Sequence, residues 1–256
     1  MMNNAIENTK YTVMKTIKPF VTLALLAVVN APSLAATVAN ETNTKIEEIT
    51  QMLQENPEVV DNLHQSLMAF IAQQQGIVTT LQRYQPHVNS AAHSAFGAMD
   101  DPQLTIINVT DYNCPYCKKL DRELEKLAKA YPQIKVVNIY TPLKEYNGPL
   151  EYNTASYALN VWRNMPDSYQ QVHDLLVANP RMHSERTMKA IAEKTGTQSQ
   201  LVQSKVSDEL LERNQQFFSD LGLRGTPALV INDQIIPGYL PYPELEKVLK
   251  AQLNPS

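Results

Sequence analysis

Two cysteines separated by two residues most constrain what this chain can fold into. Cys114 and Cys117 are the only cysteines in the sequence. The apolar run 104–109 just before them is typical of a buried strand, and apolar residues at helical spacing follow them. The pair is therefore predicted to lie where a strand turns into a helix.

The start of a helix would make one of these cysteines reactive. First-turn N–H groups have no partner within the helix, and the helix dipole places partial positive charge there. Both effects stabilise a thiolate at Cys114, so we expect its pKa to be lowered. Pro115 suits the first turn because its missing N–H is not needed there. Cys117 lies one turn on, close enough to form a disulfide with Cys114.

Zinc binding or a structural disulfide would also use paired cysteines. Zinc takes about four ligands, and no second CxxC or paired-histidine motif follows in the sequence. A disulfide that closes so short a loop would stabilise the fold little. The pattern therefore favours a redox-active pair, with no metal and no bound cofactor.

The N-terminus predicts export. Lysines precede the short apolar run 20–29, and Ser33-Leu34-Ala35 has the small-x-small pattern of a cleavage site. We expect residues 1–35 to be a cleaved signal peptide, because the run is too short to span a bilayer. The net charge is −4 at pH 7 and stays negative without the leader's lysines, which argues against nucleic acid as a partner.

Residues 36–98 are predicted to form an N-terminal helical oligomerisation segment and a linker. After a disordered start at 36–44, one helix ends at Asn56-Pro57, and a second begins there with Asn56 as its N-cap. Residues 85–103 are rich in small residues and proline, so we expect an irregular connection. The second helix carries an apolar stripe: Val60, Leu63, Leu67, Phe70 and Ile71.

That stripe has two interpretations. It packs either on its own domain or on a second subunit, and the second is favoured because the segment has little of its own to fold against. A homo-oligomer is therefore expected, most simply a dimer.

Residues 99–256 are predicted to form an α/β domain. Strand 134–140 would complete a βαβ unit with 104–109. An all-helical insertion is expected at about 149–222. Ser184 is expected to cap its third helix and Gly196 to follow the end of that helix, and the fourth helix is expected to start near Ser199. A hairpin should follow at 228–236.

These elements resemble the thioredoxin superfamily, and within it the DsbA-like periplasmic disulfide oxidoreductases. The resemblance rests on Cys114-Pro115-Tyr116-Cys117 after a strand, the helical insertion, and Gly225-Thr226-Pro227 before the penultimate strand. It implies a thioredoxin-like fold, with Cys114 as nucleophile and Cys117 as resolving thiol. It also implies a cis proline at Pro227 and a substrate groove formed by Pro115, Tyr116, Thr226 and Pro227.

One position departs from the family. A buried acid often stands in the strand before the cysteines, and here that position is Asn108. The nearest acid is Asp111, which suits a turn better. Proton transfer to and from Cys117 therefore stays open between Asp111, Lys118 and water.

The resemblance implies exported protein substrates, a periplasmic location and a membrane redox partner that recharges the site. Oxidase and isomerase activity both remain open, although Thr226 and the N-terminal helices favour isomerase. Those helices look like the ones in oligomeric members, including ScsC-like proteins and dimeric DsbA-like enzymes. A different class, a holdase or a copper-sequestering thiol protein, also remains open because two thiolates bind Cu(I).

Overall fold

The computed structural model describes residues 34–143 and 153–253. The predicted signal peptide, residues 1–35, lies outside the described residues except for its last two positions, and the first part of the predicted insertion also lies outside them. Within the two described ranges, no helix is both long and apolar enough to cross a membrane.

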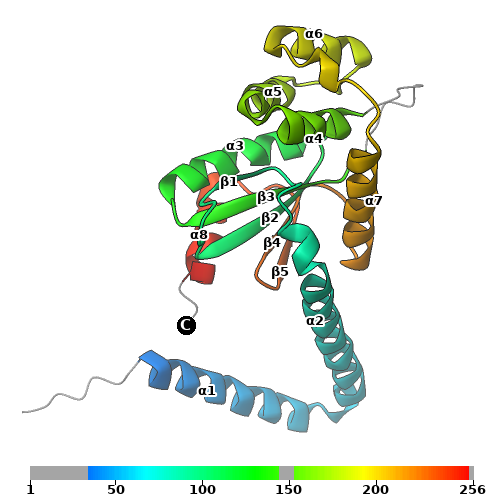
Figure 1. Cartoon of the computed structure of the whole chain (residues 1–256). Helices are drawn as coiled ribbons and strands as arrows, with labels where there is room; N and C mark the ends of the chain where they lie inside the picture. The colour runs from blue at the N-terminus through cyan, green and yellow to red at the C-terminus, as the bar shows by residue number, and fades with distance from the viewer. Residues whose placement is uncertain (1–33, 144–152, 254–256) are drawn as a thin grey trace, which may run out of the picture.

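A five-stranded sheet lies at the centre of the molecule (Figure 1), in the order β1-β3-β2-β4-β5. β2 and β3 are parallel and joined by α3 (Pro115–Ala130), whereas the other neighbours are antiparallel. The predicted βαβ unit and C-terminal hairpin are thus confirmed. The strands are β1 (Ala95–Gly97), β2 (Leu104–Thr110), β3 (Ile134–Tyr140), β4 (Ala228–Ile231) and β5 (Gln234–Pro237).

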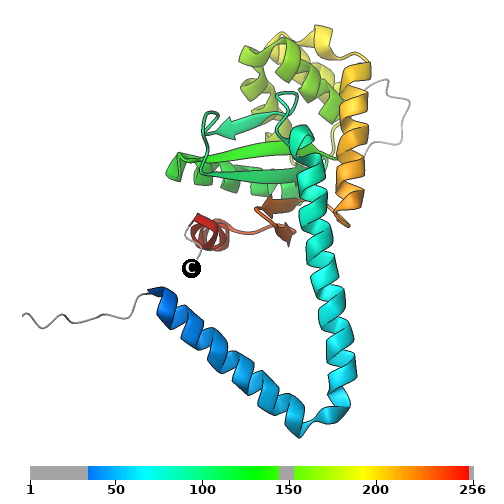
Figure 2. The same ribbon diagram turned by 60° about the horizontal axis from the view of Figure 1, so that its bottom comes forward.

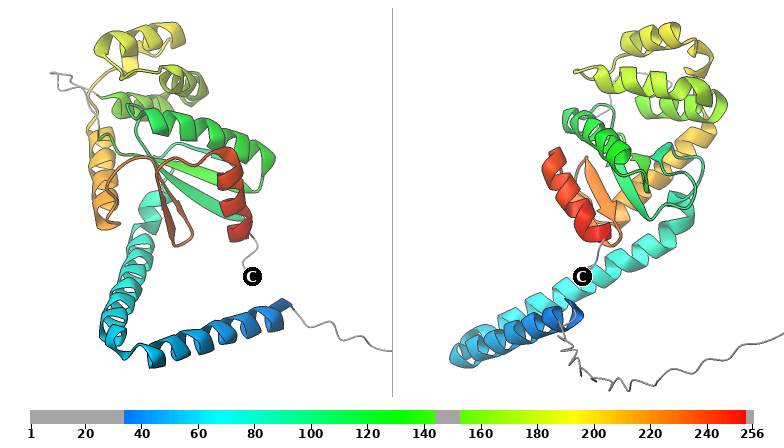
Figure 3. Two further views of the ribbon diagram at one scale, coloured as in Figure 1. Left: turned by 180° about the vertical axis from the view of Figure 1, so that it is seen from behind. Right: turned by 90° about the vertical axis from the view of Figure 1, so that its left-hand side faces the viewer.

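Helices cover both faces of the sheet (Figure 3). Side chains alternate along a strand, so Leu104 and Ile106 of β2 pack with α3 and α8 (Tyr242–Leu253). Val109 packs on the other side, against α7 (Lys205–Asp220) and the end of α2 (Val60–Val88). The end of β2, where the cysteine loop begins, is therefore fixed from both faces.

The insertion forms a helical layer over α3 (Figure 1), made of α4 (Thr154–Asn164), α5 (Pro166–Ala178) and α6 (Glu185–Thr195). Ser184 caps α6 and Gly196 ends it in the left-handed region, as predicted. The fourth helix, α7, starts at Lys205 and not near Ser199. Its start is set by Ser204, whose side chain accepts a hydrogen bond from the Ser207 N–H.

Two helices precede the sheet (Figure 2): α1 (Leu34–Glu55) and α2, joined by a 3₁₀ turn at Pro57–Val59. The C-terminal end of α2 packs on the domain, where Ile77, Tyr84 and Val88 are buried and the Tyr84 hydroxyl donates to Asp220 at 2.9 Å. The rest of α2 and α1 project away from the sheet and leave their apolar residues in solvent.

Three sequence-based expectations for this region are wrong. Residues 40–44 are helical, not disordered. Asn56 makes no side-chain cap to the next helix, because its amide donates to the Met52 carbonyl at the end of α1. Residues 85–103 contain the end of α2 and strand β1, so an ordered strand precedes the predicted domain start at residue 99. β1 exists through its pairing with β3, a long-range contact that local sequence does not reveal.

Gly97 provides a test of how β1 is joined to the sheet. Its φ is +86°, and a Cβ there would overlap the Ile134 carbonyl oxygen. Gly97→Ala should therefore destabilise the protein by about 2 kcal/mol or more, measured as a lower urea midpoint. Gly76→Ala, at an exposed helical site with nothing within 4 Å, is the control and should be neutral or stabilising. Equal midpoints for the two variants would contradict this account of β1.

Candidate active site

The loop after β2 places Cys114 at the start of α3. Asp111 accepts a hydrogen bond from the Asn113 N–H through its side chain at 2.8 Å, and its carbonyl accepts from the Cys114 N–H at 3.0 Å. Asp111 is therefore a turn residue, the role that the sequence favoured. Cys114 is the N-cap of α3 with extended backbone, and Pro115 follows at the first helical position.

Both cysteines are reduced and buried. Neither is in a disulfide, and only 3% of Cys114 and 2% of Cys117 is exposed. Cys114 is thus more covered than is usual for a nucleophile that attacks substrate disulfides. Its thiol donates to the Thr226 carbonyl at 3.3 Å, and this contact accounts for part of the cover.

The local structure lowers the pKa of Cys114 from its ordinary value of 9.0 to about 5. The main cause is a hydrogen bond from the Cys117 thiol, which outweighs the opposing effect of burial. The backbone N–H groups of Cys117 and Tyr116, in the first turn of α3, lower the pKa further. Burial, together with the bond donated to Cys114, raises the pKa of Cys117 well above its ordinary value. The pair is therefore strongly asymmetric, as the position at a helix start predicts.

The Thr226-Pro227 step lies against the cysteines. The peptide bond between these residues is cis, as the resemblance implied, and the Thr226 carbonyl contacts Cys114. Pro227 is buried and Thr226 is half-buried. On the other side of the pair, Tyr116 is 58% exposed. Pro115 is exposed as well, so these two residues and Thr226 present surface beside Cys114.

Sequence reasoning missed the contacts that tie the site to the helical insertion. The Lys118 ammonium donates to the carbonyls of Asn179 and Arg181 at 2.6 and 2.8 Å. The Asn113 side chain accepts from the His183 N–H at 2.8 Å. Burial lowers the pKa of Lys118 to about 8. The loop at 179–183 therefore fixes both ends of the Cys114–Cys117 turn.

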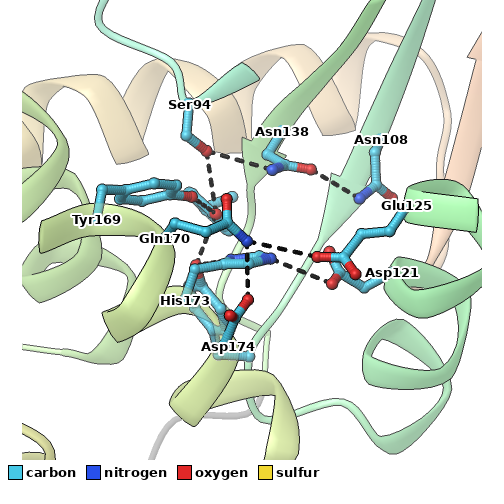
Figure 4. A network of polar contacts seen from close by, with 11 residues as sticks. Ser94, Asn108, Asp121, Glu125, Asn138, Tyr169, Gln170, His173 and Asp174 are labelled. Carbon is cyan, nitrogen blue, oxygen red and sulfur yellow. Dashed lines mark hydrogen bonds and ion pairs between the residues drawn. The ribbon is translucent and has the colours of Figure 1, made fainter. Parts of the chain in front are cut away.

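A second missed feature lies beneath Cys117. Asp121 of α3 contacts His173 of α5, with Asp121 Oδ2 and His173 Nε2 3.1 Å apart. Figure 4 shows this pair with Glu125, Gln170 and Asp174 around it. The sequence held one signal: Asp121 follows Leu120 on the apolar face of α3, where a solvated acid does not belong.

The same cluster is the one group of metal-ligand side chains found among the described residues. Ligand atoms of Asp121, Glu125 and His173 lie within 4.8 Å of one another. The other ring nitrogen of His173, Nδ1, lies 2.7 Å from the Tyr112 hydroxyl, so both nitrogens already have hydrogen-bond partners. We therefore assign the cluster to a hydrogen-bonded network and not to a metal site.

Comparison with known proteins identifies the class. Residues 105–250, more than half of the chain, match the DSBA-like thioredoxin domain. The chain therefore belongs to this family and is a thiol–disulfide oxidoreductase with a DsbA-like thioredoxin fold. The disulfide bond formation protein D of Bacillus subtilis is 20% identical over 166 residues, which are 60% of this chain and 75% of that protein.

Two solved proteins are more similar. A linker-deletion mutant of ScsC from Proteus mirabilis is 30% identical, with a TM-score of 0.64 over 88% of this chain and 98% of that one. The catalytic domain of that protein is 33% identical, with a TM-score of 0.62 over 69% and 98%. A periplasmic thioredoxin-like protein from Salmonella enterica serovar Typhimurium is 35% identical, with a TM-score of 0.60 over 66% and 95%.

The Cys114 thiolate should titrate with a midpoint near pH 5. Its ultraviolet absorbance and its alkylation rate against pH measure this, and Cys117→Ala should move the midpoint upward because the largest stabilising hydrogen bond is lost. A midpoint near the ordinary 9.0 would contradict the assignment.

The pKa of Cys114 is lower in the folded protein than in the unfolded chain, so the thiolate's contribution to stability is complete above about pH 9 and lost as pH falls through about 5. The unfolding free energy of the reduced protein, compared with Cys114→Ser, should follow this pH dependence.

Proposed function

We propose that this protein is exported through its N-terminal leader and forms or isomerises disulfide bonds in other exported proteins. The observation that carries the proposal is the Cys114 sulfur, which has a low pKa and lies between the first turn of α3, the Cys117 thiol and the Thr226 carbonyl. The match to a periplasmic thioredoxin-like protein supports the periplasm as its location.

In the reducing direction, the Cys114 thiolate attacks one sulfur of a substrate disulfide. A mixed disulfide forms and the other substrate sulfur leaves as a thiolate. Cys117 then loses its proton and attacks the Cys114 sulfur, which releases the first substrate sulfur. The cysteine pair has lost two electrons and the substrate disulfide has gained them. Oxidation of a substrate dithiol runs these steps in reverse from the Cys114–Cys117 disulfide, and a membrane redox partner would restore the starting state.

The substrate is held in a groove beside Cys114. Thr226 supplies backbone groups that pair with an extended peptide, as in strand addition. The ring of Tyr116 is exposed, lies 6.3 Å from the Tyr239 ring and offers an apolar contact to the substrate. Recognition mainly through backbone gives broad specificity, which suits an enzyme that acts on many exported proteins.

The N-terminal helices make the protein a homo-oligomer, most simply a dimer. Leu63, Leu67 and Phe70 are 45%, 52% and 57% exposed in the single chain. Burying each such side chain is worth roughly 1.5–3 kcal/mol, so association with a second copy of the chain, which would bury them, is favourable. The match to ScsC covers 88% of this chain against 69% for its catalytic domain, which supports a shared region outside that domain.

Oligomerisation favours isomerase activity. Two copies that pair through α2 would place two Cys114 sites around one cleft. A misfolded client held there can be attacked by one site while its other disulfides are re-formed. An isolated domain lacks that cleft and retains only simple thiol exchange.

Active-site variants test the chemistry. Cys114→Ser should abolish both insulin reduction and refolding of scrambled ribonuclease, because no nucleophile remains. Cys117→Ser should keep the first attack and accumulate mixed disulfides with substrates, visible on non-reducing gels. Undiminished activity of Cys114→Ser would overturn the assignment. Tight Cu(I) binding by the wild type without any turnover would instead favour a copper-sequestering thiol protein.

Glutamates placed in the apolar stripe of α2 test whether the protein forms an oligomer through this helix. Leu63→Glu with Leu67→Glu should give a monomer by light scattering, with insulin reduction retained and ribonuclease isomerisation reduced severalfold. The matched control is Gln65→Glu with Ala72→Glu, which adds the same charge on the opposite face of α2 and should stay oligomeric.

Truncation provides a second test, and the structure sets its limit. Residues 36–71 are removable, because the buried part of α2 begins near Ile77. A monomeric wild type, or an oligomeric stripe variant, would mean that these helices serve another purpose.

A further inference from the structure

The resolving thiol needs a route for its proton. Cys117 is 2% exposed, and burial keeps its proton bound. When Cys117 attacks the mixed disulfide the proton must leave, and when Cys117 is released as a thiolate a proton must return. Asn108, in the strand behind the pair, is an amide that hydrogen-bonds to Asn138 at 2.9 Å and is not a base.

A small cavity borders Cys117. It has a volume of ≈ 10 Å³, and its walls include Cys117, Lys118, Asp121 and His173. About 10–15 Å³ is the least that holds one water, and a water also needs polar partners. The cavity therefore has the size and the lining for a single bridging water between Cys117 and the groups beneath it.

Asp121 is placed to exchange a proton with that water. It lies four residues after Cys117 and thus on the same side of α3, and only 4% of it is exposed. His173 is equally buried, and its two nitrogens are held between Asp121 Oδ2 at 3.1 Å and the Tyr112 hydroxyl at 2.7 Å. The Asp121 carboxylate is therefore fixed in orientation, with the cavity on one side and the imidazole on the other.

A larger pocket lies on the other side of His173. His173 lines the small cavity and also this larger pocket of about 550 Å³, which Glu125, Lys129 and Asp174 border. Figure 4 shows the His173 ring beside Asp121, with Gln170 and Asp174 of the same helix close to it. Both nitrogens of His173 already have partners, so the imidazole orients Asp121 and does not carry the proton onward. The route from Asp121 to the larger pocket runs past Glu125, which borders that pocket and whose carboxylate lies within 4.8 Å of the Asp121 carboxylate.

We propose that Asp121, positioned by His173, accepts the proton of Cys117 through one water during resolution and returns it in the reverse reaction. The step rests on the proposed thiol chemistry. The Cys117 S–H bond breaks, and its electron pair forms the bond to the Cys114 sulfur. The proton moves through the water to the Asp121 carboxylate, and the substrate sulfur leaves with the electrons of the mixed disulfide.

Other ionisable groups surround the Asp121–His173 pair. They come from α3, α5, β3 and the loop after β2, and they are Lys118, Glu125, Tyr169, Asp174, Tyr140, Asp111 and Tyr112. Burial by itself would lower the pKa of His173, but the surrounding carboxylates, Asp121 first and then Glu125 and Asp174, together outweigh burial and the pKa of His173 is raised. Burial keeps the pKa of Tyr112 well above its ordinary value, so this phenol stays protonated and orients the ring.

Lys118 and Asp111 are the competing acceptors. The Lys118 ammonium already donates to two carbonyls, and with a pKa of about 8 it is mostly protonated at pH 7, so it is a poor acceptor there. The Asp111 carboxylate accepts from the backbone N–H groups of Asn113 and Leu143 at 2.8 and 3.1 Å, which commits it to the turn.

The two half-reactions can be watched separately with the chromogenic disulfide DTNB. The reduced wild-type protein should release one thionitrobenzoate when Cys114 attacks and a second when Cys117 resolves. Asp121→Asn should slow the second release by roughly 10–100-fold at neutral pH and shift its pH profile upward. The first release should be unchanged, and Asp121→Glu should restore most of the second. Asp167→Asn removes an exposed carboxylate of α5 that borders neither cavity, and serves as the charge control.

The outcomes separate this proposal from the proposed function. Failure of wild-type Cys114 to react would undercut the thiol chemistry itself. A normal first release with an unchanged second release in Asp121→Asn would overturn the relay, and loss of the second release in Lys118→Met alone would assign it to Lys118. If Asp121→Asn folds poorly, His173→Gln decides: the proposal requires it to slow the second release and to change its pH profile while the first release stays normal.

Discussion

The chemistry of this protein depends on one interaction, the stabilisation of a negative charge on the buried sulfur of Cys114. Cys114 holds that charge because the Cys117 thiol and the first-turn N–H groups of α3 point toward it. Those groups are in place only while α3 starts at the end of β2. Three fully buried leucines, Leu120, Leu124 and Leu127, hold the helix on the sheet. The hydrophobic face of α3 thus supports the chemistry at its end.

The helical insertion contributes to the site as directly as the sheet does. Lys118 and Asn113 bond to the loop at 179–183, and His173 of α5 holds Asp121 below the pair. The site is therefore enclosed by α3 from one layer and α5 from another. Contacts of this kind explain how a thiol as buried as Cys117 can be surrounded by polar groups without being open to bulk solvent.

Sequence reasoning found what local signals encode. The cysteine pair, the caps of α6 and the final hairpin each depend on residues close together in the chain, and each appears where it was expected. Strand β1 and the Asp121–His173 pair depend on partners about forty and fifty residues away, and local pattern says nothing about such partners. Thr226 and Pro227 were placed beside Cys114 only because a family resemblance supplied that long-range contact.

The course of α2 constrains how an oligomer positions its active sites. The helix runs without interruption from the exposed stripe at Leu63 and Leu67 to its buried end at Val88. The break from α-helix to 3₁₀ turn lies upstream, at Pro57–Val59. If two copies paired through α2, this continuous helix would fix the position of each catalytic domain relative to the interface. If they paired through α1 alone, the 3₁₀ turn at Pro57–Val59 would lie between the interface and the active site. A shared cleft would need a fixed separation between two Cys114 sulfurs, so pairing through the apolar stripe of α2 would fit the proposed isomerisation better than pairing through α1 alone.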